Sequence, residues 1–423
     1  MISDVEHTVS DRRYALADRV RSGSILVAHH DKHHLYNTAA AYAAIGRLGG
    51  FATQTYAFRP TWSRSISRIR VPRLAAEARR CDNHFDERLR GHVLLHCPSR
   101  ERYVLSLLLG GVGTYSPHSF HDWVSELVVR NGWHCHTHCT GALAIFGACR
   151  SRGTLCILEQ YVADRRQGAE LLVDECDVLG IRDSAAVLHG AGFTKEKIEV
   201  NEEEYALSDA IVAGSSFVAQ SLTKAGVAKD KVVVAPYGVA AEWFRRGQEW
   251  RQRRAGERLE VAFVGNDFVR KGLVYALKAV AGLGDKNAHL HVFGSASAHG
   301  CEHFVSSHAT FHGSLSPGEL GDALSKCHAA VLPSLWEGSS LAVYEMLACG
   351  LPAIVTPNTG AVVSDGVDGF VVPIRSHEAI AECLQRLFDE ATRRCMSLRA
   401  KETAARYTWE AYGRALRNGL GIR

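Results

Sequence analysis

The sequence lacks any apolar run long enough to cross a bilayer. Its longest runs, such as AAVLP after His328, contain only a few residues, whereas a spanning helix needs about 20. The first residues, MISDVEHTVSDRRYALADR, mix charges and lack the apolar centre of a signal peptide. The 12 cysteines have no regular spacing, which is typical of reduced thiols rather than of a disulfide framework. These absences predict a cytoplasmic protein.

Lysine is missing from the segment between Arg59 and Arg102, which has eleven arginines and five acids. Such a segment is either a solvated face or a surface for an anionic partner, such as lipid headgroups or a phosphorylated molecule. It leaves open a peripheral contact with the inner face of a membrane. Nucleic acid is disfavoured, because no RNA motif with interleaved aromatics and no DNA-reading helix accompanies the charge.

Two domains are expected from a length of 423 residues. Short β-branched runs alternate with helix-like stretches, a pattern that indicates α/β domains with parallel sheets. A helix is predicted over 37–50, ended by its Gly pair. The first series of expected strands is SILVAHH, ATQTYAF, GWHCHTHC, TLCILEQ, DAIVAGS and KVVVAPYGV. The second series is LEVAFVG, LHVFG, ATFHGS, AAVLPS, PAIVT and GFVVP.

A polar, charged stretch at about residues 240–258 separates the two series. It predicts an N-terminal domain over 1–240 and a second domain over 259–405. A C-terminal helix at about 406–423 is expected to pack back on the first domain. Two such units imply a cleft between them, where ligands of parallel sheets bind.

The second domain opens with VGNDFVRKG, in which a strand ends at Gly265 and a short loop leads to a helix. Arg270 and Lys271 would stand at the start of that helix. Side-chain cations, free backbone N–H groups and the helix dipole together make an anion site. The alternative is a pair of exposed basic residues.

Two acids, Glu337 and Glu345, enclose the apolar stretch in EGSSLAVYEMLACGLP. The small residues Gly338, Ser339 and Ser340 would let backbone amides approach a ligand closely. Eight residues at a helical rise of about 1.5 Å would separate the carboxylates by roughly 10 Å. That is the span from a sugar across a diphosphate to a ribose. The alternative is a surface acid, a helix cap and a second acid on a buried helix.

Taken together, these stretches resemble the family-4 retaining glycosyltransferases. The matching segments are VGNDFVRKG, FHGSL, LPSLWEGSSLAVYEMLACGLPAIVTPNTG and DGFVVP, and the similarity covers most of residues 130–412. The resemblance implies the GT-B fold, in which two Rossmann-like parallel-sheet domains face a cleft. It implies transfer of a hexose from a nucleotide sugar.

The resemblance also implies roles for particular residues. Arg270 and Lys271 would hold the donor diphosphate, Glu337 the sugar and Glu345 the ribose. The other expected donor-binding residues are Gly265, Asn266, Ser314, Leu315, Gly338, Ser339, Ser340 and Leu341. Asn266 stands where many members carry Arg, and Arg270 would supply that cation. The first loop is HHDKHHLYN where members usually have a Gly pair.

His138 is the remaining residue with an expected catalytic role. WHCHTHCTGALA resembles the family's strand-end histidine motif, which faces the cleft. His138 is therefore expected either to contact the donor sugar or phosphate, or only to cap a strand end.

Metal binding is disfavoured for both groups of histidines and cysteines. Along a strand, Cys135 and Cys139 share one face while His136 and His138 share the other, so one tetrahedral site would have to gather both faces. The chain also lacks the Asp-x-Asp pair, the usual metal clamp of the other main glycosyltransferase fold. The second group is His29, His30, His33 and His34. We therefore expect no metal at either group and no cofactor.

The sequence thus predicts a metal-independent retaining glycosyltransferase that uses a front-face mechanism. Its partners would be a nucleotide sugar donor and a hydroxyl acceptor, either a glycan, a lipid-linked molecule or a small molecule. His30, His33 and His34 of the first loop are the expected acceptor-side residues. The alternatives are a sugar-nucleotide epimerase of the same fold and an inactive nucleotide-sugar-binding relative.

Overall fold

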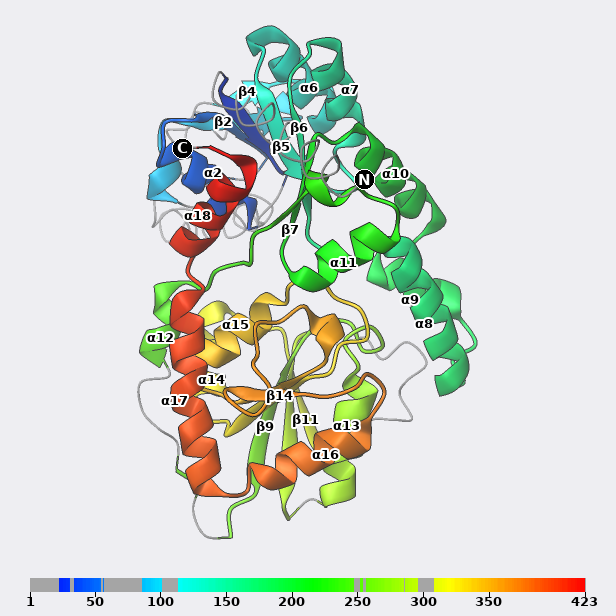
Figure 1. Cartoon of the computed structure of the whole chain (residues 1–423), viewed down its shortest axis with the longest axis vertical. Helices are drawn as coiled ribbons and strands as arrows, with labels where there is room; N and C mark the ends of the chain where they lie inside the picture. Colours follow the sequence, from blue (N-terminus) through cyan, green and yellow to red (C-terminus); the bar gives the residue numbers. More distant parts are fainter. Residues whose placement is uncertain are drawn as a thin grey trace, which may run out of the picture.

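Two parallel sheets organise the chain in the computed structural model (Figure 1). The structure describes residues 23–30, 34–54, 56, 86–100, 113–246, 252–253, 256–284, 286–295 and 308–422. Each sheet is flanked by helices and forms a domain of its own, and the two domains are stacked along the long axis of the molecule. The α/β prediction is therefore confirmed.

The first sheet has eight strands in the order β4-β3-β2-β1-β5-β6-β7-β8, and each neighbouring pair is parallel. The strands are β1 (Ile25–Ala28), β2 (Leu48–Thr53), β3 (Val93–Cys97), β4 (Gly113–Tyr115), β5 (His134–His138), β6 (Cys156–Gln160), β7 (Ala210–Ala213) and β8 (Val232–Val234). Its helices are α2 (Leu35–Ala43), α6 (Phe120–Asn131), α7 (Leu143–Ser151), α8 (Arg165–Leu179), α9 (Ser184–Ala191), α10 (Lys195–Leu207) and α11 (Ser216–Lys224).

The second sheet has six strands in the order β11-β10-β9-β12-β13-β14, and it too is parallel. They are β9 (Leu259–Val264), β10 (Ala288–Phe293), β11 (Ala309–Gly313), β12 (Ala329–Leu332), β13 (Ala353–Val355) and β14 (Gly369–Val371). The helices of this half are α12 (Ala241–Arg246), α13 (Leu273–Leu283), α14 (Pro317–Leu324), α15 (Leu341–Ala348), α16 (His377–Arg386) and α17 (Glu390–Arg406).

The strand order of each sheet reverses at one place. In the first sheet β1 lies between β2 and β5, and in the second β9 lies between β10 and β12. The loops that leave the two strands at such a reversal diverge to opposite faces of the sheet, and ligands of open α/β sheets bind in the crevice between them. The fold therefore has two candidate positions for a ligand, at β1/β5 and at β9/β12.

The C-terminal part of the chain connects the two domains. Helix α17 runs along the second domain, and α18 (Trp409–Leu420) lies against α2 and β8 of the first domain (Figure 1). The hydroxyl groups of Thr38 and Tyr412 are hydrogen-bonded at 2.8 Å across this contact.

The strand predictions are confirmed for both series, except for the second strand of the first series. The helix predicted over 37–50 is too long, because α2 ends at Ala43 and Gly46 turns the chain with a φ of 66°. The Gly pair at 49–50 therefore belongs to β2, which starts at Leu48 and ends at Thr53 instead of covering ATQTYAF. Strands β3 and β4 were not predicted. No helix in the described part of the chain is long and apolar enough to span a membrane.

Candidate active site

A cavity of about 580 Å³ lies between the two domains at the β9/β12 position. Most of its wall comes from the second domain, and His34, Tyr161 and Tyr237 contribute from the first. Ten of the residues expected from the sequence to bind a donor line it: Gly265, Asn266, Arg270, Lys271, Ser314, Leu315, Glu337, Ser339, Ser340 and Leu341. The structure thus brings together segments that are up to 76 residues apart, from Gly265 to Leu341.

Three charged side chains form the polar centre of this cavity. Arg270 and Lys271 directly precede α13, as the sequence predicts. Glu337 binds both: its Oε1 accepts from Nη1 of Arg270 at 2.9 Å, and its Oε2 accepts from Nζ of Lys271 at 2.6 Å. Asp267 also accepts a hydrogen bond from Nε of Arg270 at 2.9 Å. Two cations are therefore held side by side at one wall.

This cluster fixes the protonation of its members. Burial would raise the pKa of Glu337, but Arg270 and Lys271 outweigh burial and lower it to about 2. Burial likewise disfavours the charged Arg270 guanidinium, but Glu337 and then Asp267 raise its pKa. The Glu337 side chain is only 14% exposed, so water screens these contacts weakly. At neutral pH the Glu337 carboxyl and the Arg270 guanidinium are therefore ionised.

The Asn266 side chain has a hydrogen-bond partner in the backbone. Its Oδ1 accepts a hydrogen bond from the backbone N–H of Ser295 at 3.0 Å. The side chain therefore ties the loop after β9 to the segment after β10, at the edge of the cavity.

The loop that carries Glu337 is also fixed to the first domain. Nε1 of Trp336 donates to the carbonyl of Asp164 at 3.1 Å, and the hydroxyl of Ser215 donates to the carbonyl of Gly338 at 2.6 Å. A Cβ atom on Gly338 would lie 1.9 Å from the carbonyl oxygen of Tyr161. We expected Gly338 to let a ligand approach, but the structure shows that it lets the first domain approach, and Gly338 is not among the described residues that line the cavity.

Glu345 lies on α15 and likewise is not among the described lining residues. The separation of 10 Å expected between the two acids assumed a helical rise over all eight residues. That assumption is wrong, because the helix begins only at Leu341 and Glu337 stands in the loop before it. The ribose contact expected of Glu345 stays a prediction.

His34 enters the cavity from the first domain and is held there by a buried carboxylate. Its Nε2 is 2.9 Å from Oε1 of Glu159, and its ring lies 4.1 Å from that of Tyr237, measured between centroids. Glu159 also contacts Nε2 of His136 at 3.0 Å and accepts a hydrogen bond from the hydroxyl of Tyr412 at 3.3 Å. Burial would raise the pKa of Glu159, but His34 and His136 lower it to about 2.

Glu159 was not identified as a functional residue from the sequence. The acid near the end of the apolar strand TLCILEQ could have indicated it, because a buried carboxylate in such a strand requires partners. Its partner His136 was considered only as a metal ligand. The structure gives that imidazole a structural role instead, because its second nitrogen bonds the hydroxyl of Tyr42 at 3.0 Å.

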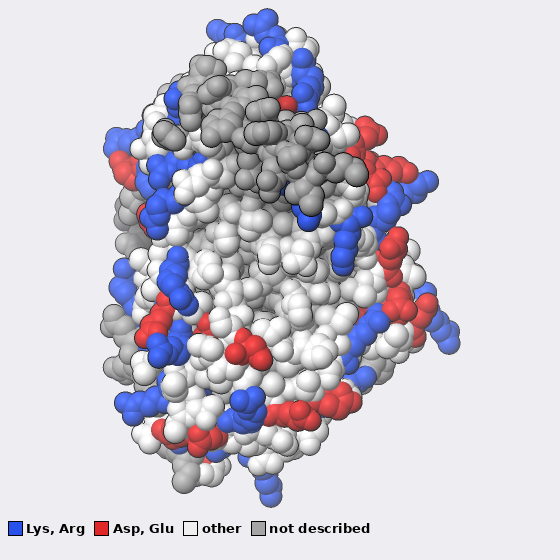
Figure 2. Space-filling view, in the orientation of Figure 1, with Lys and Arg blue, Asp and Glu red and all other residues white. Residues whose placement is uncertain are grey.

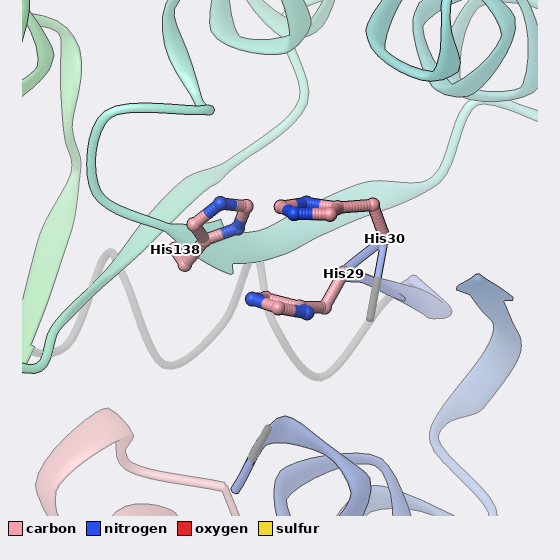
Figure 3. A group of neighbouring side chains, drawn as sticks. All are labelled: His29, His30 and His138. Carbon is pink, nitrogen blue, oxygen red and sulfur yellow. The ribbon is translucent and has the colours of Figure 1, made fainter. Parts of the chain in front are cut away.

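His138 lies apart from the described lining residues of the cavity. Its ring packs against His29 and His30, at centroid distances of 4.3 Å and 5.6 Å (Figure 3). Burial, and then repulsion by His29 and His30, lowers the pKa of His138 well below its usual value. His30 therefore lies beside His138, and His33 lies outside the described residues.

One face of the molecule carries charges of both signs. On the face shown in Figure 2, Lys and Arg are interspersed with Asp and Glu along the sides of the molecule. Most of the arginine-rich segment after Arg59 lies outside the described residues.

Comparisons with known proteins agree with this geometry. Residues 258–390 match the family model "Glycosyl transferases group 1". A sucrose synthase from Acidithiobacillus caldus is 35% identical over 94 residues, which are 20% of this chain and 12% of that protein. An MMP alpha-(1->4)-mannosyltransferase from Mycolicibacterium hassiacum is 27% identical over 231 residues, 50% of this chain and 55% of the relative. The matches therefore span less than two thirds of these relatives.

The solved structures extend the similarity to both domains. Anabaena HepE, solved in complex with UDP and glucose, superposes with a TM-score of 0.61 at 12% identity. The superposition covers 95% of this chain and 100% of HepE. At this identity the likeness establishes the fold. Residues 258–390 are thus similar to the glycosyl transferases group 1, within a chain of the GT-B fold.

Proposed function

We propose that this protein is a retaining glycosyltransferase that moves a sugar from a nucleoside diphosphate sugar to a hydroxyl acceptor. The observation that carries the proposal is the pair of cations, Arg270 and Lys271, held by Glu337 at the β9/β12 position. Breaking the anomeric C–O bond leaves negative charge on the diphosphate, and fixed cations beside a helix N-terminus stabilise that charge. HepE was solved with UDP and glucose, which makes a UDP-sugar the first donor to test.

Glu337 has two parts in this proposal. Without a donor its carboxylate holds both cations. A donor diphosphate would take over one or both of these contacts, which frees a carboxylate oxygen to accept hydrogen bonds from sugar hydroxyls. With Arg270 and Lys271 supplying the positive charge, cleavage of the donor needs no divalent ion. Retention without a carboxylate nucleophile is then explained by front-face attack, in which the leaving phosphate helps to deprotonate the acceptor.

The acceptor approaches from the first domain in this arrangement. His34 lines the same cavity as Arg270 and Lys271 but comes from the first domain, and its Nε2 is bonded to Glu159. We assign His34 to the acceptor hydroxyl. The arginine-rich segment after Arg59 is the proposed surface for an anionic carrier, such as a lipid-linked acceptor.

A donor panel tests the proposal directly. The purified chain is incubated with UDP-sugars and other nucleotide sugars without acceptor, and the products are separated. Slow hydrolysis to the free nucleotide supports a transferase. Epimerised donor would support the epimerase alternative, and binding without any turnover would support an inactive relative.

A further inference from the structure

Three imidazoles meet at the other reversal of strand order, between β1 and β5. His29 and His30 directly follow β1, and His138 is the last residue of β5. Figure 3 shows their rings turned toward one another. Each offers one nitrogen, and in the described part of the chain these nitrogens lie within 4.8 Å of one another. The fold thus joins residues from two segments that are more than a hundred positions apart in the sequence.

We propose that His29, His30 and His138 bind one divalent transition-metal ion of the Zn²⁺ type. Imidazole nitrogens suit Zn²⁺, Co²⁺, Ni²⁺ and Cu²⁺, whereas Mg²⁺ prefers oxygen ligands. Tetrahedral zinc with bonds of about 2.0–2.1 Å places its nitrogens about 3.3 Å apart. The three nitrogens therefore need to close by roughly 1.5 Å at most, which small side-chain rotations supply.

The loop after β5 packs closely against the His138 ring. Gly141, in the loop after β5, faces His138: a Cβ atom there would lie 2.7 Å from its Cε1 and 2.8 Å from its Nε2. Glu204 anchors the same loop, because its carboxylate accepts hydrogen bonds from the backbone N–H groups of Thr140 at 2.7 Å and Ala142 at 2.8 Å. Any larger side chain at position 141 would push the His138 ring out of place.

Exposure leaves one side of the site open. His29 and His138 are each 6% exposed, whereas His30 is exposed at the surface. Three protein ligands with a fourth position open to a small molecule are typical of zinc sites that take water or substrate. The ion would therefore keep a position for water or for another oxygen ligand.

The site is separate from the proposed donor chemistry. None of the three histidines is among the described residues that line the cavity around Arg270 and Lys271. The metal proposal does not rest on the proposed function, and either can fail without the other.

Metal titration of the whole chain tests the proposal without any activity measurement. Chelator-treated protein is dialysed and titrated with Co²⁺, and the visible absorption of the bound ion is recorded. A competing chelator then gives the Zn²⁺ affinity. We expect one ion per chain with the spectrum of a nitrogen-ligated site, and no competition by Mg²⁺.

His30→Asn is the deciding variant, because His30 is exposed and its replacement leaves the core intact. It should lower the Zn²⁺ affinity by more than about 100-fold, the upper end of what loss of an outer-shell partner costs. His138→Asn should lower the Zn²⁺ affinity in the same way, provided that circular dichroism shows that the variant is folded.

His312→Asn is the matched control. His312 is an exposed histidine of β11 that bonds His291, whose other nitrogen contacts Glu260. The His312→Asn variant should retain the wild-type affinity for Zn²⁺. A wild-type chain that binds no ion, a His30→Asn variant that binds as well as wild type, or a loss confined to His312→Asn would each overturn the proposal.

Discussion

The main-chain oxygen of Glu337 accepts a hydrogen bond from the backbone N–H of Ala163 at 3.2 Å. The side chain of the same residue binds Arg270 and Lys271. One residue of the second domain therefore holds the cations of the cavity and contacts the first domain. The contact between the domains and the two cations of the cavity therefore share one residue.

Removing either cation should slow turnover of the donor. For Arg270→Ala and Lys271→Ala we expect a loss of transition-state stabilisation of about 2–4 kcal/mol, which is about a 30- to 900-fold lower kcat. The measurement is steady-state hydrolysis or transfer with the preferred nucleotide sugar. Lys278→Ala is the control, since Lys278 is exposed on the same helix α13. Unchanged turnover in both folded variants would remove the diphosphate site from this wall.

Packing at Gly338 provides a second test. Gly338→Ala introduces a Cβ atom 1.9 Å from the carbonyl oxygen of Tyr161, so the loop or the domain contact must shift. We expect a stability loss of about 1–3 kcal/mol and weaker donor binding, measured by urea unfolding and by nucleotide titration. Gly282→Ala in α13 meets nothing within 4 Å and should instead stabilise by about 0.5–1 kcal/mol. Equal stability of the two variants would show that the contact is not formed in solution.

Acid should destabilise the protein through Glu337. Its pKa in the folded chain is lowered from 4.5 to about 2, so its contribution is complete above about 4.5 and is lost as the pH falls toward 2. A shift of this size corresponds to about 3 kcal/mol. The free energy of unfolding, measured at pH 5 and pH 3, should fall less in Glu337→Gln than in wild type. Glu203→Gln, at an exposed position of α10, should keep the wild-type difference.

The parts of the site that could be predicted from the sequence are those formed by neighbouring residues. Arg270 and Lys271 stand together before a helix, and strand, loop and helix there follow one another within a few positions. The partners of these cations could not be derived in the same way. Glu337 reaches them across 66 and 67 positions, and the helical rise assumed between Glu337 and Glu345 was wrong because the helix begins only at Leu341.

The histidines show the same limit in the first domain. Strand alternation argued against a metal site made by residues 135–139 alone, and this stays a prediction. It could not show that His138 meets His29 and His30, because that contact depends on β5 pairing with β1. The partners of Glu159 likewise come from separate elements, α18 among them.

Chelation should not affect cleavage of the donor. With Arg270 and Lys271 supplying positive charge at the diphosphate, hydrolysis without acceptor should proceed at the same rate in EDTA as in Mg²⁺. The assay follows release of free nucleotide from enzyme treated with chelator beforehand. Loss of hydrolysis in EDTA that a divalent ion restores would contradict the proposed metal-independent cleavage. It would not bear on metal binding by His30, which is measured directly.

The last prediction separates the two substrates. His34 lines the cavity from the first domain, and its Nε2 is bonded to Glu159, which holds the imidazole in place. If this imidazole contacts the acceptor hydroxyl, His34→Asn should impair transfer while sparing hydrolysis of the donor in the absence of acceptor. Glu159→Gln should act in the same direction, because it removes the charge that orients the imidazole. His118→Asn is the control, since His118 is exposed in the loop before α6. Equal loss of hydrolysis and transfer in His34→Asn would place this imidazole on the donor sugar, and the acceptor would then have to be held by other residues of the first domain.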